Sequence, residues 1–368
     1  MHKKRILAGI ALAAAGAMTL MGCASGNTGG GSAGDGDGGY RIALSMSYSG
    51  NDWQGEAQSL VYAAAESDAL KDKVDSVETF IAGTDAQTQI SQIQQMITAQ
   101  YDAILIYPIS PTALNQVIKQ GCDAGIPMFT YDAVVTEPCA KNVTFDQAEF
   151  GKVGAEYLSD LMGDTGNVVL ITGVAGTSVD EDRTNAARAV FEERGINVLD
   201  SCAGDWAQGP AGECMSRFLA AFDDIDGVWA QVGGVAVPAA FEAAGRPFVP
   251  MIAEAENLYR LHLQDPEYIE NGLQGGSAGS PPWQSAAALH MAVRAIEGEE
   301  FPSTIDVGFD WATQEDLKMC ETGSAEELEA GCNTFPAGMV SDGFMADWWH
   351  PEWTAGIDLD TLLSVDVD

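Results

Sequence analysis

The sequence predicts an α/β protein with two Rossmann-like lobes and parallel sheets. From residue 40 onward, apolar runs rich in β-forming residues alternate with stretches whose apolar residues recur at spacings of three and four. This alternation is typical of βαβ units and parallel sheets. About 330 residues follow residue 39, more than one core usually holds, and no linker divides them in the middle. We therefore expect two lobes assembled from discontinuous segments.

Each element follows from a local pattern. Helices are expected where apolar residues share one face, as in Ile90, Ile93 and Ile97, and over residues 285–298. Several strand candidates are apolar almost throughout, which is expected when helices cover both faces of a sheet. The strand candidates are RIALSMS, AILIYP, IPMFTYD, NVVLITG, GVWAQVG and FVPMIAE.

The first 39 residues carry export and tethering signals. A basic start, MHKKR, precedes an apolar stretch over residues 6–20, which is shorter than the ~20 residues needed to cross a bilayer. These features predict a signal peptide over residues 1–22. Residues 20–23, LMGC, resemble a bacterial lipobox, so Cys23 is expected to be lipidated. An uncleaved anchor and an ordinary signal cut near Ala24 are the alternatives. Residues 23–39 are rich in Gly and Ser and are expected to form a flexible tether.

The charge balance excludes two classes of partner. The chain has 54 acidic and 17 basic residues. Such a surface repels nucleic acid and anionic lipid headgroups. We therefore expect no nucleic-acid partner, and membrane contact only through the N-terminal lipid, on the extracytoplasmic face of the cell membrane.

Six cysteines remain after Cys23, and they form three close couples along the chain. Fifteen pairings are possible, so the sequence alone does not decide between them. The simplest hypothesis for an oxidising compartment is sequential disulfides, each closing a short loop. A zinc site is the alternative, although CxxC spacing is absent. The predicted pairs are Cys122 with Cys139, Cys202 with Cys214, and Cys320 with Cys332.

Five stretches resemble, in order and spacing, the ribose-type sugar-binding proteins of bacterial ABC importers, which have the type I periplasmic-binding fold. The resemblance runs from about Arg41 to about Phe309. It implies two lobes joined by a three-segment hinge, with a small sugar held between them. The stretches are RIALSMSYSGNDWQGEAQ, YDAILIYPISPTALNQVIKQGCDAGIPMFTYD, GNVVLITGVAGTSVDEDRTNAARAVFEERG, GVWAQVGGVAVPAAFEAAG and AIEGE.

The resemblance assigns ligand contacts at strand ends and in the loops that follow them. Amide, carboxylate and guanidinium groups would bind sugar hydroxyls, and aromatic rings would pack on the sugar's C–H face. The alternatives are purely structural roles: a core position for Trp53, a turn-capping role for Asp132 and a surface ion pair for Arg183. The candidates are Asn51, Trp53, Tyr107, Asp132, Arg183 and Trp206.

Departures from the family pattern bear on the ligand. Val232-Gly233 stands where the family usually has Asn-Asp, and AEAEN makes Glu254, Glu256 and Asn257 the polar candidates of a later strand. Trp283 either enters the cleft or starts a helix. The extra acids argue against a sugar acid or a phosphate. A small neutral sugar or polyol fits, and so does a ligand bearing an amine.

Enzyme readings are weaker. GGSAG matches GxSxG, with Ser277 as nucleophile, His350 in the expected order, and Asp306 or Asp310 between them, but an HGGG-type stretch is lacking. No histidine spacing suits a metal and no glycine-rich motif suits a nucleotide, so no metal or cofactor is expected.

The acidic tail after residue 310 holds Trp348, Trp349 and Trp353. These side chains either line the cleft or pack the tail against the body, and we favour the packing role.

The resulting prediction is a monomeric, lipid-anchored solute-binding protein that delivers its ligand to an ABC permease and is not an enzyme. A sensory ligand-binding lipoprotein is the alternative, and a secreted α/β serine hydrolase is a weaker one. Lobe 1 is expected to comprise residues 40–145 and 280–308. Lobe 2 is expected to comprise residues 146–279 and 309–368, including a C-terminal extension.

Overall fold

The computed structural model describes residues 38–47 and 49–365. The predicted signal peptide, the lipidation site Cys23 and most of the tether lie outside these residues. Within the described part of the chain, no helix is both long and apolar enough to cross a bilayer.

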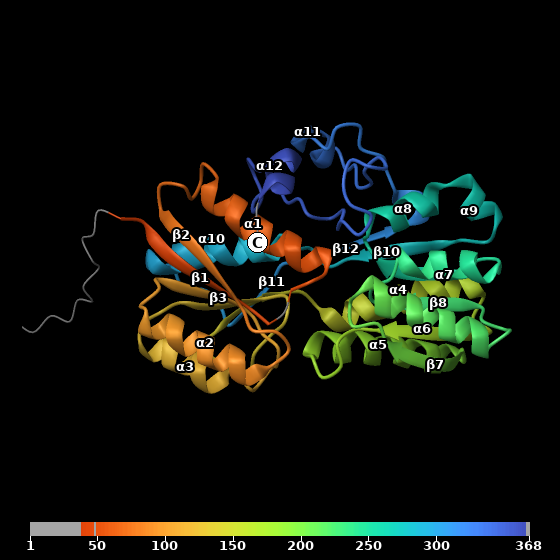
Figure 1. Ribbon diagram of the computed structural model, residues 1–368, viewed down its shortest axis with the longest axis horizontal. Coiled ribbons are helices and arrows are strands. Elements are labelled where there is room, and N and C mark those ends of the chain that lie inside the picture. Colours follow the sequence, from red (N-terminus) through yellow and green to blue (C-terminus); the bar gives the residue numbers. More distant parts are fainter. Residues whose placement is uncertain (1–37, 48, 366–368) are drawn as a thin grey trace, which may run out of the picture. The chain divides into compact units, whose positions relative to one another are not determined.

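Two six-stranded sheets form the framework, which confirms the predicted α/β fold (Figure 1). The sheet of lobe 1 is parallel throughout. Its strands, in spatial order, are β11 (Thr304–Asp306), β5 (Lys141–Thr144), β4 (Met128–Tyr131), β3 (Ala103–Tyr107), β1 (Tyr40–Met46) and β2 (Val74–Ile81).

The sheet of lobe 2 has the same strand count and one antiparallel edge. Its edge strand β12 pairs antiparallel with β10, and the other pairs are parallel. The order is β12 (Asp310–Thr313), β10 (Gly275–Gly279), β9 (Met251–Glu254), β8 (Gly227–Ala230), β6 (Asn167–Thr172) and β7 (Asn197–Ala203).

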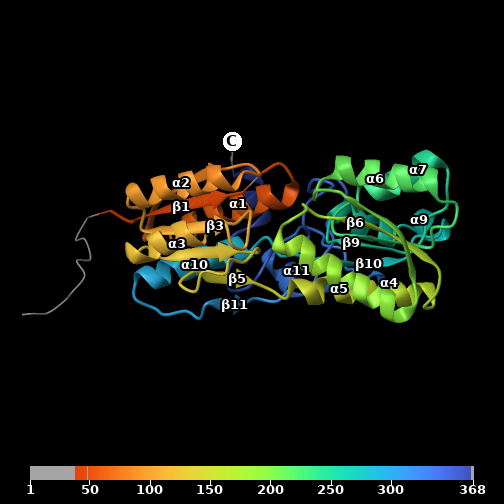
Figure 2. The same ribbon diagram turned by 90° about the horizontal axis from the view of Figure 1, so that it is seen from below.

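Helices cover both faces of each sheet, as the continuous apolar strands require (Figure 2). In β1, Ile42 and Leu44 join one core cluster, whereas Ala43 joins the cluster on the opposite face. In lobe 1, α1 (Asp52–Glu66) and α10 (Gln284–Ile296) contact each other, as do α2 (Ala86–Thr98) and α3 (Asn115–Asp123). The lobe 2 helices are α4 (Gln147–Met162), α5 (Ser178–Arg194), α6 (Gln208–Ala221), α7 (Ala236–Ala244), α8 (Asn257–Gln264) and α9 (Pro266–Glu270).

The chain passes between the two sheets three times. The passages lie between β5 and α4, between β10 and α10, and between β11 and β12. A side-chain cap starts the helix after the first passage: the Asp146 side chain accepts from the N–H of Glu149 at the start of α4. Three connections between two lobes are the arrangement that the sequence resemblance implies.

A C-terminal extension, residues 314–365, packs on both lobes (Figure 1). It contains η1 (Gln314–Asp316), α11 (Ala325–Glu329) and α12 (Leu359–Ser364). On lobe 2, the side chain of Arg260 forms two hydrogen bonds of 2.7 Å with the carboxylate of Asp347. On lobe 1, α12 contacts α1, and the N–H of Met345 donates to Glu56 over 2.8 Å. The extension, expected as part of lobe 2, therefore bridges the two lobes.

The tryptophans of this extension serve packing. Trp348 is fully buried in the core cluster that contains α1 and α10, and Trp349 and Trp353 pack against it. The Trp353 ring lies 6.0 Å from that of His290, and the Trp283 ring lies 4.4 Å from that of His350.

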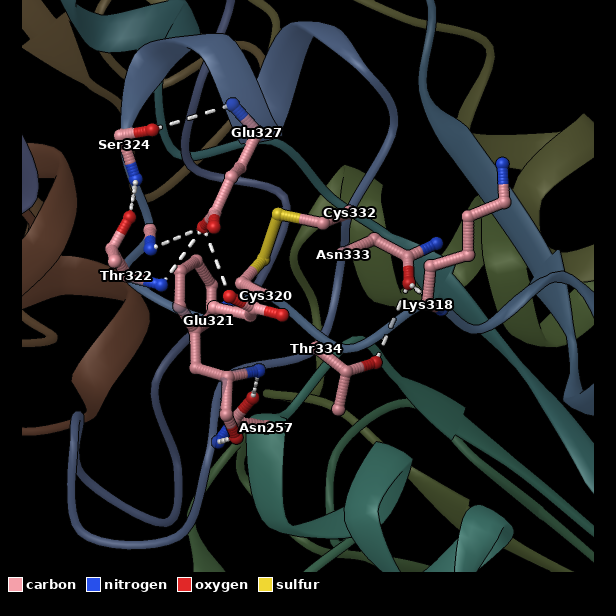
Figure 3. Close-up of a disulfide and its surroundings, with 12 residues drawn as sticks. Asn257, Lys318, Cys320, Glu321, Thr322, Ser324, Glu327, Cys332, Asn333 and Thr334 are labelled. Atoms are coloured by element: carbon pink, nitrogen blue, oxygen red, sulfur yellow. Dashed lines mark hydrogen bonds between the residues drawn. A yellow bond between two sulfur atoms is a disulfide. The ribbon is translucent and has the colours of Figure 1, made fainter.

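All three predicted disulfides are present. Their Cα–Cα distances are 6.4, 5.8 and 5.1 Å for Cys122–Cys139, Cys202–Cys214 and Cys320–Cys332. The last closes a loop around α11 (Figure 3). In this loop the Glu327 carboxylate accepts backbone N–H groups of Thr322 and Gly323 at 2.9 Å. The disulfide thus fixes a short helix that is too small to be stable alone.

Candidate ligand-binding cleft

A cavity lies between the two lobes at the carboxyl ends of their strands. The space inside this inner cavity, part of which is open to solvent, amounts to ≈ 280 Å³. Open α/β sheets bind ligands at this edge. Seven of its ten lining residues were predicted from the sequence. The lining residues are Asn51, Trp53, Gln54, Tyr107, Asp132, Val179, Arg183, Trp206, Glu254 and Ser280.

The loop after β1 places an amide and an indole against lobe 2 and the hinge. Asn51 caps α1, accepting from the N–H of Gln54 at 2.8 Å, and its Nδ2 donates to the carbonyl of Trp206 at 3.0 Å. Trp53 donates from Nε1 to the carbonyl of Ser280 at 2.9 Å. Its ring lies 5.7 Å from the ring of Tyr107. The loop is thus held to both other parts of the site, and Trp53 presents an aromatic surface.

Asp132 follows β4 and is held by three side-chain donors. Its Oδ1 accepts from Gln147 at 3.0 Å, Gln284 at 3.2 Å and the Ser280 hydroxyl at 3.4 Å. Its φ of 59° lies in the left-handed region, a conformation that non-glycine residues retain mainly where surrounding structure enforces it. Burial raises the pKa of Asp132, and the nearby Arg183 opposes that shift.

Arg183 projects from α5 into the same cavity. It donates from Nη1 to Glu254 at 2.8 Å and from Nε to Gln147 at 2.7 Å. Its guanidinium also lies 3.9 Å from the ring centre of Phe150. Burial raises the pKa of Glu254 to about 7, against the lowering effect of Arg183. The surface-ion-pair alternative for Arg183 does not apply, because its side chain is 2% exposed.

Trp206 is held in an unusual backbone conformation. It has a φ of 51° and follows Asp205 with a φ of 53°. Its Nε1 donates to Gln231 at 2.8 Å. The ring lies directly on Gly173, where a Cβ atom would come within 2.2 Å of it. Glycine at 173 therefore makes room for the indole.

A second, open chamber adjoins the inner cavity, since Asn51 and Trp206 line both. Glu256 lies in this outer chamber and accepts from the backbone of Gly233 and Gly234 and from Gln208. Its pKa is raised to about 8, chiefly by burial and next by the charge of Glu254. The remaining lining residues are Gly50, Asp52, Ala207, Gln208, Gly209, Val232 and Met345.

Two predicted contacts lie away from both cavities. Asn257 accepts from the N–H of Phe335 and donates to its carbonyl at 2.7 and 2.9 Å, so it holds the C-terminal extension. Trp283 is buried beside His350 and precedes α10. Of the two roles left open for Trp283, the structure shows the helix start.

Comparisons with known proteins agree with this architecture. Residues 42–300, more than half of the chain, match the family model described as a periplasmic binding protein domain. The chain belongs to this family. The xylitol-binding protein of Mycolicibacterium smegmatis is 28% identical over 225 residues, covering 60% of this chain and only 63% of that protein. The ribose import binding protein RbsB of Salmonella typhimurium is 24% identical over 274 residues, covering 70% of this chain and 91% of that protein.

A solved structure shows the same fold. An ABC transporter periplasmic solute binding protein from Actinobacillus succinogenes, with bound D-allose, matches with a TM-score of 0.66 and 22% identity. The match covers 75% of this chain and 98% of that chain. The sequence resemblance to ribose-type binding proteins is thereby confirmed.

The GxSxG match has a structural explanation in this periplasmic binding protein. Ser277 lies inside strand β10, fully buried, and not at a strand-to-helix turn. Its hydroxyl accepts from Nε of Arg260 at 2.9 Å. A nucleophile elbow needs an exposed hydroxyl after the strand. Among the described residues, no group of three His, Cys, Asp or Glu side chains is arranged to hold a metal ion.

Three glutamines of the site escaped the sequence analysis. Gln54 lines the inner cavity, Gln147 links Asp132 to Arg183, and Gln231 orients Trp206. Gln54 directly follows the predicted Trp53, and Gln231 ends the apolar run GVWAQ. Their positions at a strand end or in the segment after a strand could therefore have marked both as site residues. Gln147 is the first residue of α4, directly after a passage between the lobes, and no feature of the sequence marked it as a site residue.

Proposed function

We propose that the chain is an extracytoplasmic solute-binding protein that captures a small sugar or polyol between its lobes. The observation that carries the proposal is the inner cavity itself. Asp132 is fixed by three donors, Arg183 by two acceptors, and aromatic rings from both lobes lie beside them. A carboxylate and a guanidinium suit adjacent hydroxyls, and the rings suit the C–H face of a sugar. Relatives named for xylitol and ribose support the same ligand class.

Capture would work by favouring the closed arrangement. Asn51 of lobe 1 already bonds to the Trp206 carbonyl of lobe 2, and Trp53 bonds to Ser280 at a passage between the lobes. A ligand touching both lobes adds contacts that exist only when the lobes meet, so it shifts the population toward that state. The closed form would then dock on an ABC permease, which takes over the unchanged solute.

The proposal includes anchoring through a lipid on Cys23, with residues 24–39 as tether. In this arrangement the binding domain stays close to the permease while its orientation remains free. The ligand is bound and released without chemistry, so recovered ligand should be identical to the ligand supplied.

A thermal-shift screen of the purified chain against pentoses, hexoses and polyols tests the proposal. A ligand that binds only the folded state raises the melting temperature with its concentration. We expect at least one small polyhydroxylated compound to do so, and mass spectrometry to recover it unchanged. Absence of any shift across the whole set would contradict the proposed function.

A further inference from the structure

We infer that the solute carries a protonated amine, so that the ligand is an amino sugar or an amino polyol. This inference rests on the proposed function and narrows it. It comes from the balance of charge and of hydrogen-bond donors and acceptors in the cavity wall.

The charge of the inner cavity is not balanced. Two carboxylates, Asp132 and Glu254, line it together with one guanidinium, Arg183. Arg183 is paired with Glu254 at 2.8 Å and also acts on Asp132 through its charge, so one guanidinium serves two carboxyl groups. Asp52 and Glu256 line the adjoining outer chamber, and none of the described residues in its lining is basic. Glu256, whose pKa is raised to about 8, is largely protonated near neutral pH and adds little charge. A buried charge is costly unless paired, and one ammonium group would pair it.

Three of the nitrogen donors of the wall are already engaged by the protein, while Nη2 of Arg183 forms no hydrogen bond with the residues that the structure describes. Nδ2 of Asn51 bonds to the Trp206 carbonyl, and the indole nitrogens of Trp53 and Trp206 bond to Ser280 and Gln231. These groups orient the site, and their bonds to protein acceptors would have to break before they could donate to a ligand.

Acceptors, in contrast, remain available. Gln54 is 1% exposed and lines the inner cavity, and its Oε1 has no hydrogen-bond partner among the residues that the structure describes. In the carboxylates of Asp132 and Glu254, the described residues donate hydrogen bonds to one oxygen only, Oδ1 of Asp132 and Oε1 of Glu254. The second oxygen of each carboxylate accepts none from them. An unpaired buried acceptor costs free energy that a ligand donor would recover. An ammonium group has three donors and no acceptor, so it fits this wall better than a hydroxyl does.

Matched ligand sets test the inference by isothermal titration calorimetry on the full purified chain at pH 7.5. Each set compares three compounds: a neutral sugar, its amino-deoxy analogue, and the N-acetylated analogue, which has the same position substituted but no charge. D-glucose, D-glucosamine and N-acetyl-D-glucosamine form one set, and the galactose and mannose sets form two more. For at least one set we expect the amine to bind about 10- to 100-fold more tightly than the other two compounds.

Two variants locate the effect. In Asp132→Asn the preference for the amine should disappear, while residual binding of the neutral sugar persists. In Gln54→Met the amine should bind several-fold more weakly, with the charge of the site unchanged. Asp72→Asn removes an exposed acid far from either cavity and should keep the full preference. Circular dichroism melting identifies any variant that fails to fold. In that case the titrations of the wild type with the three ligand sets decide whether the inference holds.

The outcomes separate this inference from the proposed function. If neutral sugars bind as tightly as their amino analogues in every set, the amine inference is wrong and sugar capture stands. Retention of the amine preference in folded Asp132→Asn also contradicts it. If no compound of any set binds, and the sugar and polyol screen is negative as well, both proposals fail.

Discussion

Arg183 and Glu254 form a buried ion pair, with 2.8 Å between Nη1 and Oε1 and side chains 2% and 5% exposed. The pair joins helix α5 to the end of strand β9, inside the cavity where ligand is expected. Gln147 accepts from Nε of the same guanidinium, and the ring centre of Phe150 lies 3.9 Å from it. Removal of Arg183 leaves Glu254 buried without its basic partner, which costs far more than the pair itself contributes.

Arg183→Met should therefore lower the free energy of unfolding by about 3–5 kcal/mol. The double variant Arg183→Met/Glu254→Gln should recover part of this loss, because no uncompensated carboxylate remains. Urea unfolding followed by circular dichroism measures both. Arg194→Met serves as control, since its partners Asp160 and Asp164 are exposed and the expected cost is about 0–1 kcal/mol. Equal losses in the single and double variants would refute the pairing argument.

The raised pKa of Glu256 predicts a dependence of stability on pH. Its folded-state pKa is about 8, against an ordinary value of 4.5, so the native state retains a proton that the unfolded chain releases. The resulting stabilisation is full below pH 4.5 and is lost as the pH rises toward 8. One proton accounts for at most about 1.4 kcal/mol per pH unit. Urea unfolding of Glu256→Gln between pH 5 and 8.5 should show a flatter profile than the wild type, and an identical slope would contradict the assignment.

Gly173→Ala should weaken ligand binding by displacing Trp206. A Cβ atom at 173 would lie 2.2 Å from the indole, so the ring must move and its bond to Gln231 is strained. We expect at least about a tenfold loss of affinity, corresponding to about 1.4 kcal/mol, measured by calorimetry. Gly55→Ala is the matched control, because a Cβ there meets no atom within 4 Å. Wild-type affinity in Gly173→Ala would show that the indole does not contribute to the site.

The C-terminal extension should detach from lobe 2 when Arg260 is lost. Arg260 is fully buried and bonds to Asp347 twice, to the Asn333 carbonyl and to Ser277. Arg260→Met leaves Asp347 unpaired, so backbone amides in residues 333–347 should exchange hydrogen faster than in the wild type. Hydrogen-exchange mass spectrometry measures this directly. Equal protection in both proteins would mean that the other contacts of the extension, such as Asn257 with Phe335 and Met345 with Glu56, hold it without Arg260.

The sequence predicted the fold well because the fold depends on patterns that are local in the chain. Continuous apolar strands such as NVVLITG require helices on both faces, and three close cysteine couples required only short loops to pair. Of the seven predicted cavity residues, six came from the family resemblance and Glu254 from a departure from its pattern; the cavity that they line lies where the carboxyl ends of the strands converge.

What the sequence could not predict depends on contacts between distant segments. Gln147 bonds to both Asp132 and Arg183 only because the passage between the lobes places the start of α4 next to these two side chains. The amide of Asn257 could bind a ligand hydroxyl, yet it forms both of its hydrogen bonds with Phe335 of the extension, 78 residues later in the chain. The bridging role of the extension was likewise invisible, since Met345 and Glu56 are 289 residues apart.

Calorimetric titration of Asp132→Ala with the tightest-binding sugar, polyol or amino sugar tests the central claim most directly. Asp132 accepts hydrogen bonds from three side chains and lines the inner cavity together with residues of both lobes. Loss of a charge-assisted contact of this kind should weaken binding at least about 100-fold, with thermal unfolding still cooperative. Wild-type affinity in folded Asp132→Ala would contradict the assignment of this cavity as the ligand site.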